Sequence, residues 1–247
     1  MEKQTVVIFG ASGAIGSTLA RKLCQDKQKV ILCSRNEEKL KQLAQELGAP
    51  YYLSDGGQET AVQALMQKIA QEEGPITGVV NCIGSFFIKP VAKTTLEEFI
   101  EVLRINLFTS FVILKASLEV MVAEGHGSLV LISSCAAQVG LVHHEAISAA
   151  KGAIQSLVKS AAASYAQKQI RINAVAPGLV DTPLSLPITS NEAALKTSLQ
   201  FHPLGRIGKA EDIASAIKWL LSDESSWITG ETLSVDGGLA HIKIKTS

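Results

Sequence analysis

The stretch Thr5-Val-Val-Ile-Phe-Gly-Ala-Ser-Gly-Ala-Ile-Gly16 decides the fold of this chain. Its first five residues form a β-branched, apolar run, which predicts a short buried strand, and an amphipathic pattern to about Asp26 predicts a helix. Glycines between a strand and a helix let the backbone approach a pyrophosphate, and the free N–H groups of the helix N-terminus favour the anion. We therefore predict a dinucleotide-binding loop that includes Gly10, Ser12, Gly13, Ile15 and Gly16.

The same alternation of strand and helix continues through the chain. Further strands are predicted at 30–33, 51–53, 78–81, 128–132, 171–176 and 232–235, and further helices at 36–47, 59–73, 96–124, 145–167 and 210–222. Nearly all-apolar strands that alternate with helices are typical of a parallel sheet covered on both faces. With no repeat or internal boundary, residues 1–247 are predicted to form one α/β domain, a Rossmann-type doubly wound parallel sheet with helices on both faces.

One segment, residues 181–203, has weak periodicity and contains three prolines. It follows a strand end, where ligands bind in open α/β sheets. We expect an irregular lid over the substrate, and the alternative is a long surface connection.

Composition narrows the class of partner. The 23 basic and 23 acidic residues give a formal net charge of +0, which argues against a nucleic acid or an anionic membrane as a partner. The four cysteines are far apart, without a CxxC or a His/Cys cluster, so we expect free thiols and no metal. No basic, apolar leader follows Met1, and no run of about 18 apolar residues is seen. We expect a cytoplasmic protein that acts on a small molecule.

The end of the second predicted strand bears on the choice of nucleotide. An NAD site usually places a carboxylate there, about 20 residues after the glycines, to accept from the ribose hydroxyls. Here Ser34 and Arg35 supply a hydroxyl and a guanidinium instead. Because a guanidinium can pair bidentately with a 2′-phosphate, we predict NADP(H) over NAD(H). The alternative is that Arg35 is an ordinary surface charge, and Glu37 and Glu38 lie close by.

These residues together resemble the short-chain dehydrogenase/reductase family over essentially the whole chain. The resemblance implies an oxidoreductase that transfers hydride to or from a small organic substrate. It also implies further nucleotide contacts, to the adenine, its ribose and the nicotinamide carboxamide. The residues that match those positions are Asp55, Asn81, Gly84, Pro177, Gly178 and Thr182.

The resemblance also implies a catalytic set of Asn, Ser, Tyr and Lys. Asn106 matches the asparagine that positions a proton-relay water, Ser134 the serine that binds the substrate carbonyl, and Lys151 the lysine that holds the nicotinamide ribose. The tyrosine should lie thirteen residues after the serine and four before the lysine. Both counts end at Ile147, which cannot donate a proton.

Three interpretations of Ile147 remain open. Another side chain could act as the acid, and His144 is the best candidate, because it lies seven residues before Lys151 on the same helical stripe. That spacing is also the one at which enoyl reductases of this superfamily carry their tyrosine. The protein could instead be a catalytically inactive NADP(H)-binding pseudoenzyme or sensor. In the third interpretation the substrate, such as a quinone or an enone, needs no protein acid there.

The two long predicted helices at 96–124 and 145–167 carry more apolar positions than one buried stripe needs. This excess indicates a subunit interface, and the family resemblance implies a homodimer or a homotetramer. The alternative is burial against the sheet alone.

Overall fold

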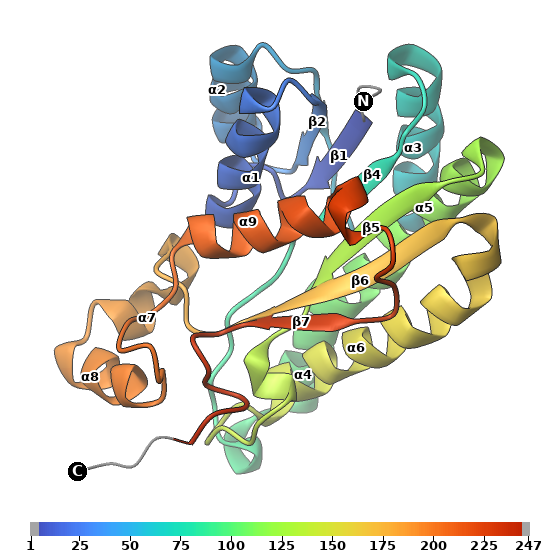
Figure 1. Cartoon of the computed structure of the whole chain (residues 1–247). Helices are drawn as coiled ribbons and strands as arrows, with labels where there is room; N and C mark the ends of the chain where they lie inside the picture. The colour runs from blue at the N-terminus through green and yellow to red at the C-terminus, as the bar shows by residue number, and fades with distance from the viewer. Residues whose placement is uncertain (1–4, 244–247) are drawn as a thin grey trace.

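The computed structural model describes residues 5–243, and it confirms the predicted parallel sheet (Figure 1). Seven strands pair in the order β3-β2-β1-β4-β5-β6-β7, and every pair is parallel. The strands are β1 (Thr5–Phe9), β2 (Lys29–Ser34), β3 (Tyr51–Leu53), β4 (Gly78–Asn81), β5 (Gly127–Ile132), β6 (Ile170–Pro177) and β7 (Thr232–Val235). The order of strands reverses between β1 and β4, so the connections that follow these two strands leave toward opposite faces of the sheet, and a crevice for a ligand is expected between them.

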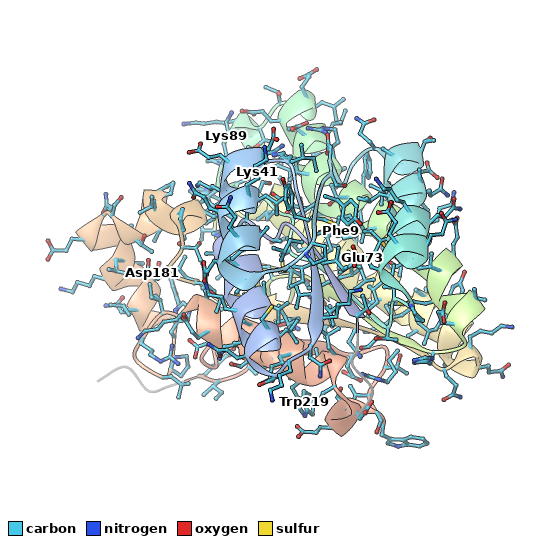
Figure 2. The ribbon with its side chains drawn as sticks, turned by 90° about the horizontal axis from the view of Figure 1, so that it is seen from above. Phe9, Lys41, Glu73, Lys89, Asp181 and Trp219 are labelled. Atoms are coloured by element: carbon cyan, nitrogen blue, oxygen red, sulfur yellow. The ribbon has the colours of Figure 1, made fainter. Side chains whose placement is uncertain are left out.

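Helices cover both faces of the sheet, as predicted. One face packs against α1 (Ala14–Gln25), α2 (Glu37–Leu47) and α9 (Ala210–Leu221), and the other against α3 (Glu59–Glu73), α5 (Thr109–Glu124) and α6 (Glu145–Tyr165). Successive side chains of a strand point to opposite faces. Val7 and Phe9 of β1 therefore belong to one apolar core, while Val6 and Ile8 belong to the other. Phe9 lies near the middle of the molecule in Figure 2.

The long helix predicted at 96–124 consists of three parts. They are α4 (Leu96–Leu103), a π-helical turn (Arg104–Phe108) and α5. Thr95 and Glu98 close the start of α4 with a reciprocal capping box. π-Helical turns occur frequently at functional sites, and this one contains Asn106.

By length and composition, the Leu96–Glu124 helix is long and apolar enough to cross a membrane, which the sequence analysis did not indicate. Its most apolar window has a mean hydropathy of 1.6 and is 56% buried inside the protein. A helix in the core of a globular fold has the same length and apolar composition, so these two properties alone do not indicate a membrane span.

The prediction that residues 181–203 are irregular is wrong. The segment contains a 3₁₀ turn (Pro183–Ser185), α7 (Leu186–Thr189) and α8 (Glu192–Gln200), which extend away from the sheet in Figure 1. Pro183 and Pro187 break the apolar periodicity but lie in the first turn of their helices, where a missing N–H costs nothing, and Pro203 follows α8. Asn191 caps α8 by accepting from the backbone N–H of Ala194. We keep the term lid for residues 181–203.

Candidate functional site

The glycine-rich loop joins β1 to α1 and leaves no room for larger residues. Gly10 has a φ of +74°, and a Cβ there would lie 2.9 Å from the carbonyl carbon of Cys82. A Cβ on Gly16 would lie 2.5 Å from the carbonyl oxygen of Gly10. Gly13 precedes α1, which has no side-chain cap and no acidic residue in its first turn. The first N–H groups of α1 are therefore available to an anion.

Polar side chains meet beside this loop at the end of β2. The hydroxyl oxygens of Ser12 and Ser34 lie 2.6 Å apart. Ser34 is buried, whereas the next residue, Arg35, is exposed and makes no ion pair or side-chain hydrogen bond within the described residues. The nearby Glu37 is paired with Lys41 at 2.6 Å. The guanidinium of Arg35 is thus free to meet an anion next to the two hydroxyls.

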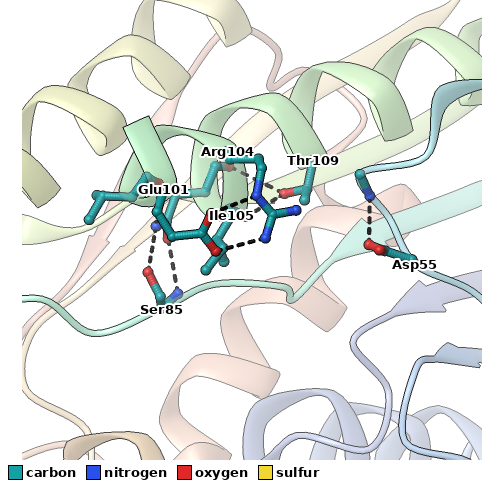
Figure 3. A network of polar contacts seen from close by, with 9 residues as sticks. Asp55, Ser85, Glu101, Arg104, Ile105 and Thr109 are labelled. Atoms are coloured by element: carbon teal, nitrogen blue, oxygen red, sulfur yellow. Dashed lines mark hydrogen bonds and ion pairs between the residues drawn. The ribbon is translucent and has the colours of Figure 1, made fainter. Parts of the chain in front are cut away.

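Residues predicted to surround the adenosine lie at the ends of β3 and β4. Asp55 is exposed, and its Oδ1 accepts from the backbone N–H of Gly57 at 3.1 Å. Figure 3 shows Asp55 across from Arg104, whose guanidinium binds both carboxylate oxygens of Glu101 at 2.6 and 2.7 Å. The Arg104 guanidinium keeps the pKa of Glu101 below its ordinary value, mainly through these hydrogen bonds. The Arg104–Glu101 ion pair therefore lies near Asp55.

Asn81 shapes the turn after β4. It is buried, its side-chain oxygen accepts from the backbone N–H of Ile83 at 2.9 Å, and its amide donates to Ser110 at 3.1 Å. Gly84 follows in a tight space, because a Cβ there would lie 3.3 Å from Oδ1 of Asn106 and 3.5 Å from Nζ of Lys151. Asn81 therefore acts on the backbone, and Gly84 lets the chain pass over the two predicted catalytic side chains.

A cavity of about 590 Å³ opens at the carboxyl ends of β4, β5 and β6, under the lid. It brings together Ser134, His144 and Lys151 of the predicted catalytic set, and Ile147. Its wall also contains five of the predicted nucleotide-binding residues, namely Ile15, Gly84, Pro177, Gly178 and Thr182. The other predicted nucleotide-binding residues, Gly10, Ser12, Gly13, Gly16, Ser34, Arg35, Asp55 and Asn81, do not line it and lie at the ends of β1, β2, β3 and β4.

Lys151 is the buried cation of the cavity. Lys151 belongs to α6, and its Nζ donates to the carbonyl oxygen of Ile132 at the end of β5, at 2.8 Å. Burial lowers the pKa of Lys151 from 10.5 to about 8, because the charged ammonium loses its hydration. One hydrogen bond uses only one of its N–H groups, so the others can bind a ligand in the cavity.

Ser134 and His144 approach the cavity from either end of the loop between β5 and α6. The Ser134 oxygen accepts from the backbone N–H of Ala136 at 3.2 Å, which orients the hydroxyl but leaves it able to donate. Nδ1 of His144 lies 2.8 Å from the carbonyl oxygen of Val142. A carbonyl only accepts, so Nδ1 carries a hydrogen, and Nε2 is the nitrogen left for a ligand.

Ile147 fills its position with a branched aliphatic side chain. It is buried among Val102, Ala146 and Ala150, and Phe87, Phe99 and Leu103 pack against the same cluster. This part of the cavity wall therefore offers a bound molecule apolar contact and no hydrogen bond.

Asn106 does not reach the cavity itself. Its side-chain amide donates to Ser85 Oγ and to the carbonyl oxygen of Val102, both at 2.8 Å, and its oxygen accepts from the backbone N–H of Ser85 at 3.2 Å. Figure 3 shows these bonds to Ser85. The cavity wall includes Ser85 in its place, so Asn106 holds the loop after β4.

His202 lies in the lid between Phe201 and Pro203, and no motif in the sequence indicated a role for it. It is 3% exposed, Nδ1 donates to the carbonyl oxygen of Ser198 at 2.7 Å, and Nε2 accepts from the backbone N–H of Leu179 at 3.2 Å. The bond to Ser198 lies within the lid, and the bond from Leu179 joins the lid to the segment after β6. Only the folded chain brings Leu179 to this imidazole.

Residues 10–240 match the family model described as enoyl-(acyl carrier protein) reductase. A 3-oxoacyl-[acyl-carrier-protein] reductase of Mus musculus is 35% identical over 234 residues, which are 94% of this chain and 96% of the relative. The chain belongs to the short-chain dehydrogenase/reductase family.

Solved structures of this family agree. A short-chain type dehydrogenase/reductase from Mycobacterium ulcerans is 30% identical with a TM-score of 0.92, and the match covers 96% of this chain and 90% of that one. A gluconate 5-dehydrogenase from Burkholderia cenocepacia, solved with NADP and tartrate, is 28% identical with a TM-score of 0.94, and the match covers 98% and 97%. Membership of the short-chain dehydrogenase/reductase family makes the chain an oxidoreductase by relationship.

Proposed function

We propose that this short-chain dehydrogenase/reductase is an NADP(H)-dependent enzyme that transfers hydride to or from a carbonyl, an enone or a quinone in a small organic substrate. The observation that carries the proposal is the joining of two features. A glycine-rich loop with uncapped N–H groups leads into a cavity that contains Ser134, His144 and Lys151. The family relationship supports hydride chemistry.

The residues fit a nucleotide with a 2′-phosphate. The exposed guanidinium of Arg35 makes no hydrogen bond or close ion pair within residues 5–243, although Glu101 lies near enough to attract it, and the hydroxyls of Ser12 and Ser34 belong to the same end of β2 and the glycine-rich loop. A charge-assisted, bidentate contact from an arginine would compensate the phosphate charge. β2 ends without the carboxylate that an NAD site usually places there to bind the ribose hydroxyls. The relative from Burkholderia cenocepacia was solved with NADP, which agrees with this assignment.

Bound NADPH would supply two electrons as hydride to the acceptor carbon. Negative charge then develops on the substrate oxygen, and the hydroxyl of Ser134 donates a hydrogen bond to it. The ammonium of Lys151 would hold the nicotinamide ribose, and its charge makes the potential in the cavity more positive. His144 delivers the proton from Nε2 when its ring is protonated, while the Val142 carbonyl keeps Nδ1–H in place. In the oxidative direction the same nitrogen receives the proton.

A second candidate function is a non-catalytic NADP(H)-binding protein. The specific observation in its favour is Ile147, which is 7% exposed within an apolar cluster and removes a proton donor from the cavity wall. General acid catalysis typically contributes about 10²- to 10⁴-fold, so its loss without replacement would leave a very slow enzyme.

Two measurements on the purified protein separate the candidates. NADPH binding is followed by the fluorescence of its nicotinamide, and NADPH oxidation is then followed with a panel of aldehydes, ketones, quinones and enones. The proposal expects tight NADPH binding and turnover of at least one class. Binding without turnover of any class would favour the non-catalytic function, and the absence of NADPH binding would refute both.

An Ile147→Tyr substitution tests the same point directly. A phenol at this position should raise carbonyl reduction by about 10²-fold or more if Ser134 and Lys151 are otherwise competent. The apolar neighbours of Ile147 leave limited space, so Ile147→Phe is the matched control for the added ring. Equal rates for the two variants would show that the cavity does not support acid catalysis at this position.

We also propose that the protein is a cytoplasmic homodimer or homotetramer. The outer surface of the π-helical turn and α5 exposes Phe108 to 47% and Phe111 to 51%, and a partner subunit would cover both rings. Size-exclusion chromatography with light-scattering detection measures the mass of the assembly, and a monomer at micromolar concentration would refute the proposed dimer or tetramer.

A further inference from the structure

The cavity wall is almost free of charge. Among the lining residues that the structure describes, Lys151 is the only Lys, Arg, Asp or Glu. The proposed function assigns this lysine to the nicotinamide ribose. The proposed function also assigns His144 to the reacting oxygen, so no further side chain of the described wall remains to balance a carboxylate, a phosphate or an ammonium elsewhere on the substrate. A buried charge without a partner is strongly unfavourable, so the cavity selects against charged molecules.

Cations near the cavity form ion pairs with neighbouring carboxylates or lie outside the cavity wall. Lys89 directly follows the lining residue Ile88, but its Nζ binds both carboxylate oxygens of Glu98 at 2.6 and 2.7 Å. Arg206, after the lid, binds both oxygens of Asp212. Lys196 belongs to α8 and does not line the cavity. To meet Lys89 or Arg206, an anionic substrate would have to break an existing ion pair, and Lys196 lies outside the cavity wall.

The hydroxyl groups in the lid are largely used by the lid itself. Ser185 donates to the carbonyl oxygens of Val180 and Thr182, and Thr197 donates to that of Ala193. Ser198 keeps a hydroxyl, which is neutral. In contrast, the polar groups of Ser134 and His144 come from the single loop between β5 and α6. Hydrogen bonding to a substrate is thus concentrated where the reacting oxygen would lie.

Most of the remaining wall residues are apolar, and part of this apolar surface is open to solvent. Phe86 and Phe87 come from the loop after β4, and Leu184, Ile188 and Phe201 from the lid. Leu184 is 52% exposed and Phe201 55% exposed, although both line the cavity. A bound apolar molecule would cover them and gain the corresponding burial free energy.

On these grounds we infer that the substrate is a neutral, lipophilic molecule with one reacting carbonyl or enone oxygen, whose hydrocarbon part lies under the lid. This inference rests on the proposed function for the identity of the reacting end. It excludes sugar acids and other carboxylates as good substrates. The size of the cavity, about 590 Å³, suits a ring system of two or three rings beside the nicotinamide.

A matched pair of ketones tests the inference. The probes are 4-phenylcyclohexanone and 4-(4-oxocyclohexyl)benzoic acid, which share one skeleton and differ by a carboxylate. Their dissociation constants are measured by calorimetry on the protein saturated with NADP⁺, and in parallel on the protein alone. The neutral ketone should bind at least about 100-fold more tightly than the carboxylate, which has no partner in the cavity. Equal affinity, tighter binding of the carboxylate, or no binding of either ketone would overturn the inference.

Two leucines of the lid provide a matched pair of variants. Leu184 and Leu186 are both 52% exposed, but only Leu184 lines the cavity. Leu184→Arg should tighten carboxylate binding at least tenfold and weaken binding of the neutral ketone, whereas Leu186→Arg should change neither. An equal effect of both variants would mean that surface charge, rather than the cavity, governs the preference, and would refute the inference.

The same experiment keeps the two proposals apart. If NADP(H) does not bind but the neutral ketone binds selectively to the protein alone, the proposed function fails and the specificity of the cavity stands. If NADPH binds and is oxidised, but the carboxylate is preferred, the proposed function stands and the inference fails.

Discussion

Lys151 allows a quantitative prediction, because the protein keeps its amine buried at a cost in stability. Burial lowers its pKa from 10.5 to about 8, and the one protein acceptor for Nζ in the described chain is the Ile132 carbonyl. Between pH 8 and 10.5 the unfolded chain holds a proton on this amine that the folded chain has lost. The free energy of unfolding should therefore rise with pH across this range.

The magnitude follows from the two pKa values. A difference of one unit corresponds to about 1.4 kcal/mol, so the full effect is on the order of 3 kcal/mol, of which about 2 kcal/mol should develop between pH 7 and 9.5. Lys151→Met removes the titrating group and keeps a chain of similar length. The difference in unfolding free energy, wild type minus variant, should become more positive by this amount as pH rises.

Urea denaturation followed by circular dichroism, at constant ionic strength and with a thiol reductant, measures this difference at pH 7, 8, 9 and 9.5. Cysteines titrate in the same range with the opposite sign, because burial raises the pKa of Cys82 to about 12 and that of Cys135 to about 11. Their contribution is present in both proteins and largely cancels in the comparison. NADPH should also bind the variant more weakly.

A difference that does not change between pH 7 and 9.5 would refute the reasoning, since the amine would then be as well solvated in the folded chain as in the unfolded one. A difference that falls with pH would mean that an unrecognised anion stabilises the ammonium. Either result would remove the argument that Lys151 is kept buried for ligand binding at the expense of stability.

Three further substitutions test the nucleotide loop and the proton donor. Arg35→Asp should weaken NADPH binding by about 10- to 100-fold and leave NADH binding nearly unchanged, as measured by fluorescence titration, and equal loss would contradict the 2′-phosphate contact. Gly16→Ala should lower the melting temperature and abolish nucleotide binding, because its Cβ would lie 2.5 Å from a loop carbonyl oxygen, whereas Gly152→Ala in α6, with its nearest neighbour at 4.0 Å, should be neutral or stabilising. His144→Ala should lower kcat about 10²-fold or more on a working substrate without changing NADPH affinity. His143→Asn is the control, because asparagine tolerates the positive φ of 65° at position 143. An unchanged kcat in His144→Ala would exclude this histidine as the acid.

The sequence by itself determined the sheet, its helical covering and the family, because these depend on local, periodic features. Most strand residues are apolar, and the central strands are buried on both faces, so the strands could be recognised without knowledge of their neighbours. The spacing of the glycines and of Ser134 and Lys151 also predicted a shared site, since parallel strands bring their carboxyl ends to one edge of the sheet.

Only the tertiary structure decided how the candidate site is filled. The lid helices were not predicted, because Pro183 and Pro187 interrupt the pattern that a helix normally shows, yet both prolines lie where a helix tolerates them. The role of Asn106 also depends on a distant partner, Ser85, which lies 21 residues away along the chain and bonds both the oxygen and the nitrogen of its amide.

The character of the cavity is the clearest case of this division. Phe87, Ile147 and Leu184 are ordinary apolar residues in sequence, and nothing in their spacing indicates that they face one space. Their convergence is a result of long-range packing between the loop after β4, helix α6 and the lid, as is the absence of a second charge in the described wall. Periodicity reports which side of its own element a residue lies on, and only the folded chain determines what lies opposite.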